Sequence, residues 1–117
     1  MSNKEITKLL KLTASLMELH DENQFKIRIY TNAVFNIEKQ DEPLIEKTQQ
    51  ELEVIEGIGK GLAQSIVEIA ERGSFSTLDD LLSKTPDGIV KMISLKGLGP
   101  KKIKVVWKEL NIENIDQ

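Results

Sequence analysis

The sequence contains no cysteine and only one histidine, which excludes disulfides, thiol chemistry and a zinc site built from these ligands. Aromatic residues make up only 4% of the 117 residues, so the core must be built mainly from Leu, Ile and Val. No apolar run approaches the roughly 18 residues of a membrane span. The amino terminus also lacks the basic-then-apolar layout of a signal peptide. We therefore expect a cytoplasmic monomer of one domain or two small lobes, with no membrane partner.

The largest excess of positive over negative charge lies in one segment of the chain. The net charge is −3, yet six lysines and no acidic residue lie between Ile89 and Lys108. The rest of the chain is therefore strongly acidic. Such an asymmetry predicts one surface that is specialised for an anion. A solvated, lysine-rich helix face is the alternative explanation.

Apolar residues recur three or four positions apart along most of the chain, which is the spacing of amphipathic helices. Ser2 and Glu5 have the spacing of a capping box and start a helix that ends before Asp21. Further helices are predicted over residues 24–40 and, more weakly, 44–54. No alternating apolar pattern supports a strand. The predicted fold is all-α, a small multi-helix bundle.

Two copies of an apolar-x-Gly-apolar-Gly motif lie forty residues apart, and each opens a helix. The first copy is Ile55-Glu56-Gly57-Ile58-Gly59, and its helix ends at Gly73, a residue suited to a carboxy-terminal cap. The second copy is Leu95-Lys96-Gly97-Leu98-Gly99, and its helix reaches Leu110. Two short helices are expected between the copies, one capped by Ser76 and one capped by Thr85 ahead of Pro86.

The two glycine turns have the features of a phosphate-binding site. Both glycines can adopt backbone angles closed to other residues, and their missing side chains let another backbone approach. The apolar residue between them anchors the turn in the core. The helix that follows presents unpaired N–H groups and the positive end of its dipole, which bind a phosphate oxygen without reading a base. The predicted DNA-binding residues are Gly57, Gly59, Lys60, Gly61, Gly97, Gly99, Lys101, Lys102 and Lys104.

The two hairpins differ in their charged neighbours. Four lysines surround the second turn, Lys96, Lys101, Lys102 and Lys104. The first turn has Lys60 but follows three acidic residues, Glu51, Glu53 and Glu56, which repel a phosphate. We therefore predict that the second hairpin carries most of the affinity.

These hairpins occur together with Phe25-Lys26-Ile27-Arg28-Ile29-Tyr30 and Ala33 after the first helix. In this combination the chain resembles, over essentially its whole length, the amino-terminal domain of bacterial family X DNA polymerases. That domain corresponds to the small lyase domain of DNA polymerase beta. The resemblance implies binding of gapped or nicked DNA in repair, on the 5′-phosphate side and without sequence preference. It also implies a lobe over residues 1–84 with the first hairpin, and a unit over 85–117 with the second hairpin and the start of a further element.

The resemblance assigns further roles to particular residues. It implies a 5′-phosphate pocket lined by Lys26, Arg28 and Tyr30. It also implies that each hairpin can hold a monovalent cation, K⁺ or Na⁺, through main-chain carbonyls. These carbonyls belong to Glu53, Ile55 and Ile58 in the first hairpin, and to Ile93, Leu95 and Leu98 in the second. The alternative for the basic helix is solvent-directed basic side chains around one half-buried tyrosine.

Ser65 stands where lyase-active relatives carry the lysine that forms a Schiff base with the abasic sugar. A hydroxyl cannot form an imine, and Lys60 on the preceding turn is expected to be solvated. We therefore predict no catalytic residue in this chain and weak or absent 5′-deoxyribose-phosphate lyase activity. A lyase remains an alternative function. A helical protein-interaction module is another, because most of the surface is acidic.

The nucleotidyl-transfer domain of the family, whose aspartates bind Mg²⁺, has no counterpart after Leu110. The chain alone is therefore not expected to be an enzyme, although its parent protein would be a DNA-directed DNA polymerase. The ending at Gln117 favours an excised domain over a free-standing module. Of the remaining side chains, we expect His20 to cap or pack against a helix and Trp107 to lie in the core.

Overall fold

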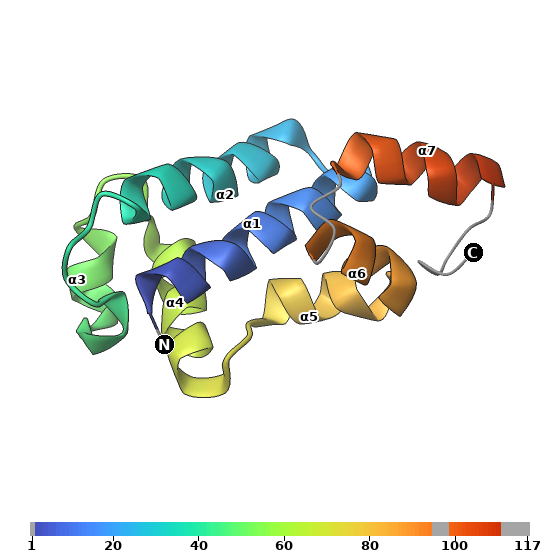
Figure 1. Cartoon of the computed structure of the whole chain (residues 1–117). Helices are drawn as coiled ribbons and strands as arrows, with labels where there is room; N and C mark the ends of the chain where they lie inside the picture. Colours follow the sequence, from blue (N-terminus) through green and yellow to red (C-terminus); the bar gives the residue numbers. More distant parts are fainter. Residues whose placement is uncertain (1, 95–98, 111–117) are drawn as a thin grey trace.

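The computed structural model describes residues 2–94 and 99–110, and every regular element within them is a helix (Figure 1). The all-α prediction is therefore confirmed. The described chain is elongated, with extents of 46 × 26 × 23 Å. The elements in order are α1 (Asn3–Leu19), α2 (Gln24–Ile37), the 3-10 helix η1 (Leu44–Glu46), α3 (Gln49–Glu53), α4 (Lys60–Arg72), α5 (Ser76–Ser83), α6 (Asp87–Ser94) and α7 (Pro100–Leu110).

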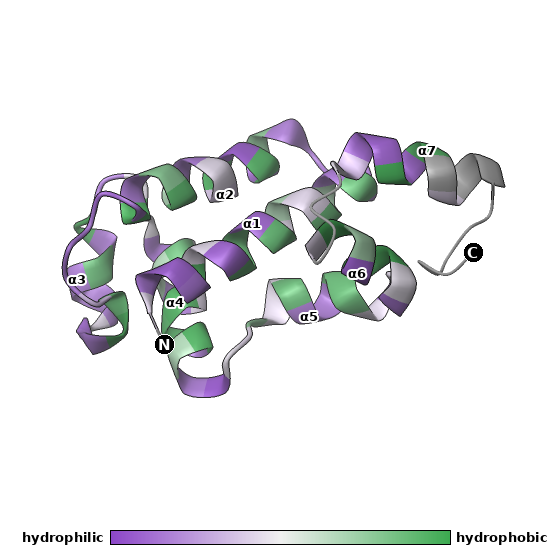
Figure 2. Cartoon of the chain, in the orientation of Figure 1, coloured by the Kyte–Doolittle hydropathy of each residue, from purple (hydrophilic) through white to green (hydrophobic). Residues whose placement is uncertain are grey.

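Helix α1 runs through the middle of the molecule and contacts α2, α5, α6 and α7. It begins at the predicted capping box, in which the Glu5 N–H donates to Ser2 Oγ at 3.2 Å and the Ser2 N–H donates to the Glu5 carboxylate. Its apolar positions Ile6, Leu10 and Leu16 are fully buried. Figure 2 shows that apolar residues form stripes along the helices rather than covering them. Burial of these stripes holds the bundle together.

Helix α2 and the segment after it differ from the prediction in their limits. Helix α2 ends at Ile37. Beyond it, backbone N–H groups donate to carbonyls only three residues earlier, such as Gln40 N–H to Ile37 O at 2.9 Å. The helix expected over 44–54 is two short elements. Thr48 separates them because its hydroxyl accepts from the Glu51 N–H and starts α3 with a second capping box.

The turn between α4 and α5 confirms one predicted cap and corrects another. Gly73 ends α4 in the left-handed conformation, with φ of 78°, as predicted. Ser76 is the first residue of α5 and not its cap, because that position belongs to the fully buried Phe75. The Ser76 N–H instead donates to the Glu68 carboxylate at 3.1 Å. The side chain of Glu68 therefore satisfies one of the N–H groups that the first turn of α5 leaves without an acceptor in the helix.

The start of α6 is tied to α1 through Thr85. The buried Thr85 hydroxyl donates to Leu81 O at 2.6 Å and lies 2.8 Å from His20 Nε2. The edge of the His20 ring meets the half-buried Trp107 ring of α7, with centroids 5.9 Å apart. His20 is thus a packing residue that joins three helices. Among helices in the described part of the chain, none is both long and apolar enough to cross a membrane.

Candidate nucleic-acid interface

The first glycine turn is a tight reversal between α3 and α4. The Ile55 N–H donates to Leu52 O at 3.1 Å, and the Ile58 N–H donates to Ile55 O at 3.0 Å. The side chain of Ile58 is only 3% exposed. As the sequence predicts, this residue anchors the turn in the core and leaves the flanking glycines at the surface.

The two glycines of this turn serve different purposes. Gly57 has φ of +84°, a conformation that favours glycine. Gly59 has φ of −88° and ψ of −176°, extended angles open to any residue, so the prediction of a special conformation at this position is wrong. A Cβ added at Gly59 or Gly61 would meet nothing within 4 Å. Their bare backbone therefore faces open space, where another backbone can approach closely.

The start of α4 leaves backbone donors without acceptors. Gly59 is the residue before the helix and makes no side-chain cap, while its carbonyl accepts from the Ala63 N–H at 2.9 Å. In a helix of this length the first N–H groups have no acceptor within the helix and carry the positive end of the dipole. This terminus is therefore suited to an anion.

The second glycine turn lies mostly outside the described residues. The predictions for Leu95, Lys96, Gly97 and Leu98 fall on residues 95–98, whose placement is not described. Gly99 is exposed, its carbonyl accepts from the Ile103 N–H at 3.1 Å, and α7 begins at Pro100 as predicted.

Two of the three lysines predicted to contact DNA from α7 face carboxylates of α1 and its end. Lys104 forms an ion pair with Asp21, and its side chain is 30% exposed. Lys101 lies 3.9 Å from the Glu18 carboxylate but is 88% exposed, so that pair is loose. Lys102 is exposed. Sequence reasoning missed Glu18 and Asp21 as neighbours of these lysines, because no local spacing links positions so far apart in the chain.

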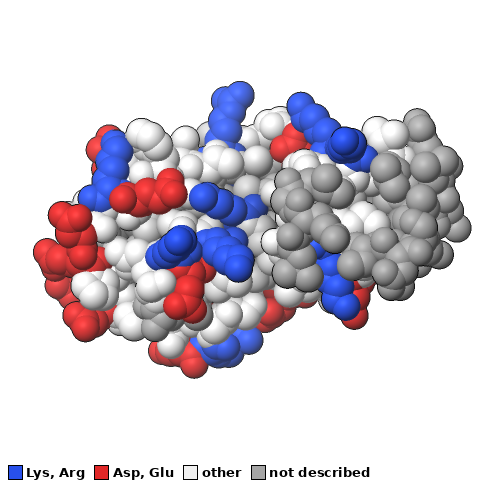
Figure 3. Space-filling view, in the orientation of Figure 1, with Lys and Arg blue, Asp and Glu red and all other residues white. Residues whose placement is uncertain are grey.

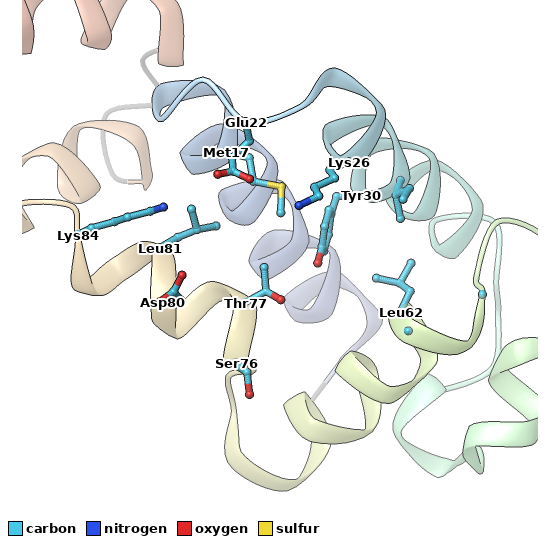
Figure 4. A pocket seen from close by; sticks show the side chains of 13 residues that line it. Met17, Glu22, Lys26, Tyr30, Leu62, Ser76, Thr77, Asp80, Leu81 and Lys84 are labelled. Carbon is cyan, nitrogen blue, oxygen red and sulfur yellow. The ribbon is translucent and has the colours of Figure 1, made fainter.

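A cavity of about 680 Å³ opens between α2, α4 and α5, and we call it the α2–α5 cavity (Figure 4). Two of the residues predicted to bind a 5′-phosphate, Lys26 and Tyr30, line it, whereas the third, Arg28, does not. Arg28 is exposed on α2. Gly59 and Gly61 also line it, so the cavity reaches the start of α4.

Tyr30 is half-buried at the wall of this cavity and stacks on Phe75, with ring centroids 6.3 Å apart. Burial raises the pKa of the Tyr30 hydroxyl, and a hydrogen bond with Thr77 acts in the opposite direction. The hydroxyl is therefore protonated at neutral pH and able to donate. Figure 4 shows it directed toward Thr77, which also lines the cavity.

Ser65 is not among the residues that line the α2–α5 cavity. Its hydroxyl donates to Gly61 O at 3.2 Å, one turn earlier on the same helix. Lys60 likewise lies beside a different hollow, together with Gln49, Gln50 and Glu53. Neither residue places a nucleophile in the cavity.

The carbonyls predicted to hold a monovalent cation are described in full only for the first hairpin. Ile55 O already accepts from the Ile58 N–H, which leaves it one further lone pair for a cation. In the second hairpin Ile93 is buried, while Leu95 and Leu98 lie outside the described residues. Within the described ranges, no group of three or more acidic or histidine side chains could hold a metal ion.

Charge is distributed unevenly over the surface. Figure 3 shows acidic side chains gathered at the end that carries α3, and basic side chains over the middle and toward α7. The exposed carboxylates near the first hairpin are Glu42, Glu46, Glu51, Glu53 and Glu56. A polyanion therefore meets repulsion at this end and attraction toward α7.

Comparison with known proteins agrees with this geometry. Residues 1–75 match the family described as helix-hairpin-helix domain. Over 116 residues the chain is 36% identical to the amino-terminal part of the DNA polymerase/3'-5' exonuclease PolX of Bacillus subtilis (strain 168), which covers 99% of this chain and 20% of that protein. The chain thus spans about a fifth of the length of that relative, and the resemblance to the amino-terminal domain of family X polymerases is confirmed. The chain belongs to the helix-hairpin-helix domain family.

Proposed function

We propose that this chain binds DNA through its phosphate backbone, without reading the base sequence, as one domain of a family X DNA polymerase. The observation that carries the proposal is the start of α4. There, the first backbone N–H groups of α4 have no side-chain cap and lie beside Gly59 and Gly61, two glycines whose α-carbons face open space. Such a terminus binds phosphate oxygens, which are the same at every base pair.

The preferred DNA is gapped or nicked and carries a 5′-phosphate. Lys26 and Tyr30 of α2 line a cavity that extends to the same helix start. A terminal phosphate carries more charge than an internal one and suits a site with a lysine and a neutral hydroxyl donor. The continuous backbone of the same strand would then follow the glycine turn.

Further parts of the proposal concern ions and the parent protein. Main-chain carbonyls of the first hairpin would hold K⁺ or Na⁺ between the turn and a phosphate. Mg²⁺ would be required only by the nucleotidyl-transfer domain of the parent polymerase, which would act in DNA repair in the cytoplasm. The chain would act as a monomer. Its second hairpin would supply most of the attraction for DNA, because lysines are concentrated around that hairpin.

Binding to short duplexes of unrelated sequence tests this proposal. We expect similar affinities for different sequences, and tighter binding to a one-nucleotide gap with a 5′-phosphate than to the same gap without it. A strong dependence on base sequence would contradict backbone recognition. An absence of DNA binding would favour the protein-interaction module, for which the acidic surface near α3 is the argument.

A further inference from the structure

We propose that Lys84 is a second phosphate-binding residue of the α2–α5 cavity, which converges with Lys26 on the terminal phosphate of a DNA 5′ end. The inference rests on the proposed function, because it names a further residue of the same site. Lys84 belongs to neither glycine hairpin and lies outside the basic segment that the sequence singles out.

The geometry brings two lysines from separate elements to one opening. Lys26 lies in the first turn of α2, while Lys84 is the residue that caps the carboxyl end of α5. Both line the α2–α5 cavity, and both are exposed. Figure 4 shows the two amino groups directed toward the same part of the cavity from either side, with the Glu22 carboxylate between them in this view. Two like charges directed at one space repel each other unless an anion lies between them.

No acidic side chain within the described ranges neutralises either lysine by an ion pair. Glu22 and Asp80 line the same cavity, yet neither Lys26 nor Lys84 is ion-paired in residues 2–94 or 99–110. The two ammonium groups therefore remain available for a ligand. The carboxylates reduce the net positive charge of the cavity, so they limit its affinity for a dianion.

The walls of the cavity provide the remaining features of a phosphate site. The hydroxyls of Tyr30 and Thr77 lie on one side, and the start of α4 lies on another. The side chains of Met17 and Leu81 form an apolar part of the lining. Apolar walls lower the local dielectric and strengthen the attraction between an ammonium group and a phosphate.

Binding of the whole chain to gapped DNA, with and without a 5′-phosphate, tests the role of Lys84. The quantity compared is the ratio of the two affinities, because general attraction to DNA cancels in it. We expect Lys84→Gln to lower this ratio by about threefold to tenfold, the loss of one exposed charge-assisted contact. Lys26→Gln should have a similar effect, and Lys84→Arg should retain most of the ratio. Lys4→Gln is the matched control, since Lys4 is exposed on α1 and does not line the cavity.

Removing an acidic neighbour of the two lysines should change the affinity ratio in the opposite direction. Asp80→Asn removes a carboxylate from the same lining and should raise the ratio about twofold to threefold. If Lys26→Gln lowers the ratio while Lys84→Gln leaves it unchanged, Lys84 has no part in the site and the inference is wrong, although the proposed function stands. If the unmodified chain shows a ratio of one, the 5′-phosphate site itself is refuted, and Lys84 with it.

Discussion

Lys104 of α7 is ion-paired with Asp21, which follows the end of α1. A lysine predicted to neutralise DNA is thus already neutralised within the protein. Asp21 holds its carboxylate there from a left-handed backbone conformation, with φ of 58°. A phosphate approaching Lys104 must compete with this carboxylate.

Asp21→Asn should therefore strengthen DNA binding. Asparagine tolerates the left-handed conformation, so the change removes the charge and leaves the backbone as it is. We expect affinity at moderate salt to rise about twofold to fivefold, the range of an exposed ion pair. A binding titration measures this effect, with thermal unfolding as the control for stability. Weaker binding would instead mean that the pair positions α7 for DNA.

Gly57→Ala should destabilise the fold. The position has φ of +84°, and an added Cβ would overlap the side-chain amide of Asn36 on α2. We expect a loss of about 1–3 kcal/mol in the free energy of unfolding, from left-handed strain and the displaced contact. Urea unfolding measures it, and an unchanged midpoint would show that the turn can shift away from α2.

Gly59→Ala should weaken DNA binding and leave the stability of the fold almost unchanged. Its backbone is extended and its surroundings are open, so the free energy of unfolding should change by less than about 0.5 kcal/mol. The added methyl group would stand where a phosphate approaches the α4 start, and DNA affinity should fall several-fold. Unchanged affinity would mean that the first hairpin does not touch DNA.

The carboxylates of Glu68 and Asp79, which both bond to Arg72 between α4 and α5, should make the stability of the protein depend on pH. Hydrogen bonds from Arg72 and the Ser76 N–H hold the pKa of Glu68 below its usual 4.5, and those from Ser74 and Arg72 lower that of Asp79 below 3.8. Because both carboxyls bind protons more weakly in the folded state, their stabilisation is complete above pH 4.5 and is lost as the pH falls through the lowered values.

Glu68→Gln tests this dependence. The variant should be less stable than the natural chain at neutral pH, and the difference should shrink as the pH falls below about 4.5. Urea unfolding at several pH values measures it. A difference that stays constant down to about pH 3 would show that the Glu68 carboxylate does not contribute through its charge.

Borohydride trapping on DNA with a nicked abasic site should yield no efficient cross-link. Ser65 cannot form an imine, and its hydroxyl is engaged with Gly61 O outside the α2–α5 cavity. An efficient cross-link would identify a lysine of this chain as a nucleophile and would revive the lyase alternative.

Local chemistry explains what could be predicted from the sequence. The capping box at Ser2, the glycine cap at Gly73 and the anchor Ile58 depend on neighbours within a few residues, and the structure shows all three. A second capping box, at Thr48 and Glu51, has the same local spacing, and it divides the helix expected over 44–54.

Contacts between distant segments explain what could not be predicted. Lys104 meets Asp21, and Lys84 faces Lys26, only because α1, α2, α5 and α7 pack together. Sequence spacing carries no information about such pairs. The role of Gly59 was also hidden, since a sequence does not reveal whether a glycine is needed for its backbone angles or for the space it leaves.

The central claim is that phosphates, rather than bases or a protein partner, are what this chain binds. A titration of affinity for gapped DNA against salt concentration tests it most directly. A plot of the logarithm of the binding constant against the logarithm of the salt concentration should be a falling straight line. Its slope should be about −0.9 for each phosphate neutralised. With about four contacts, affinity should drop roughly a hundredfold between about 50 and 200 mM salt. An affinity that does not change over this range would contradict the account.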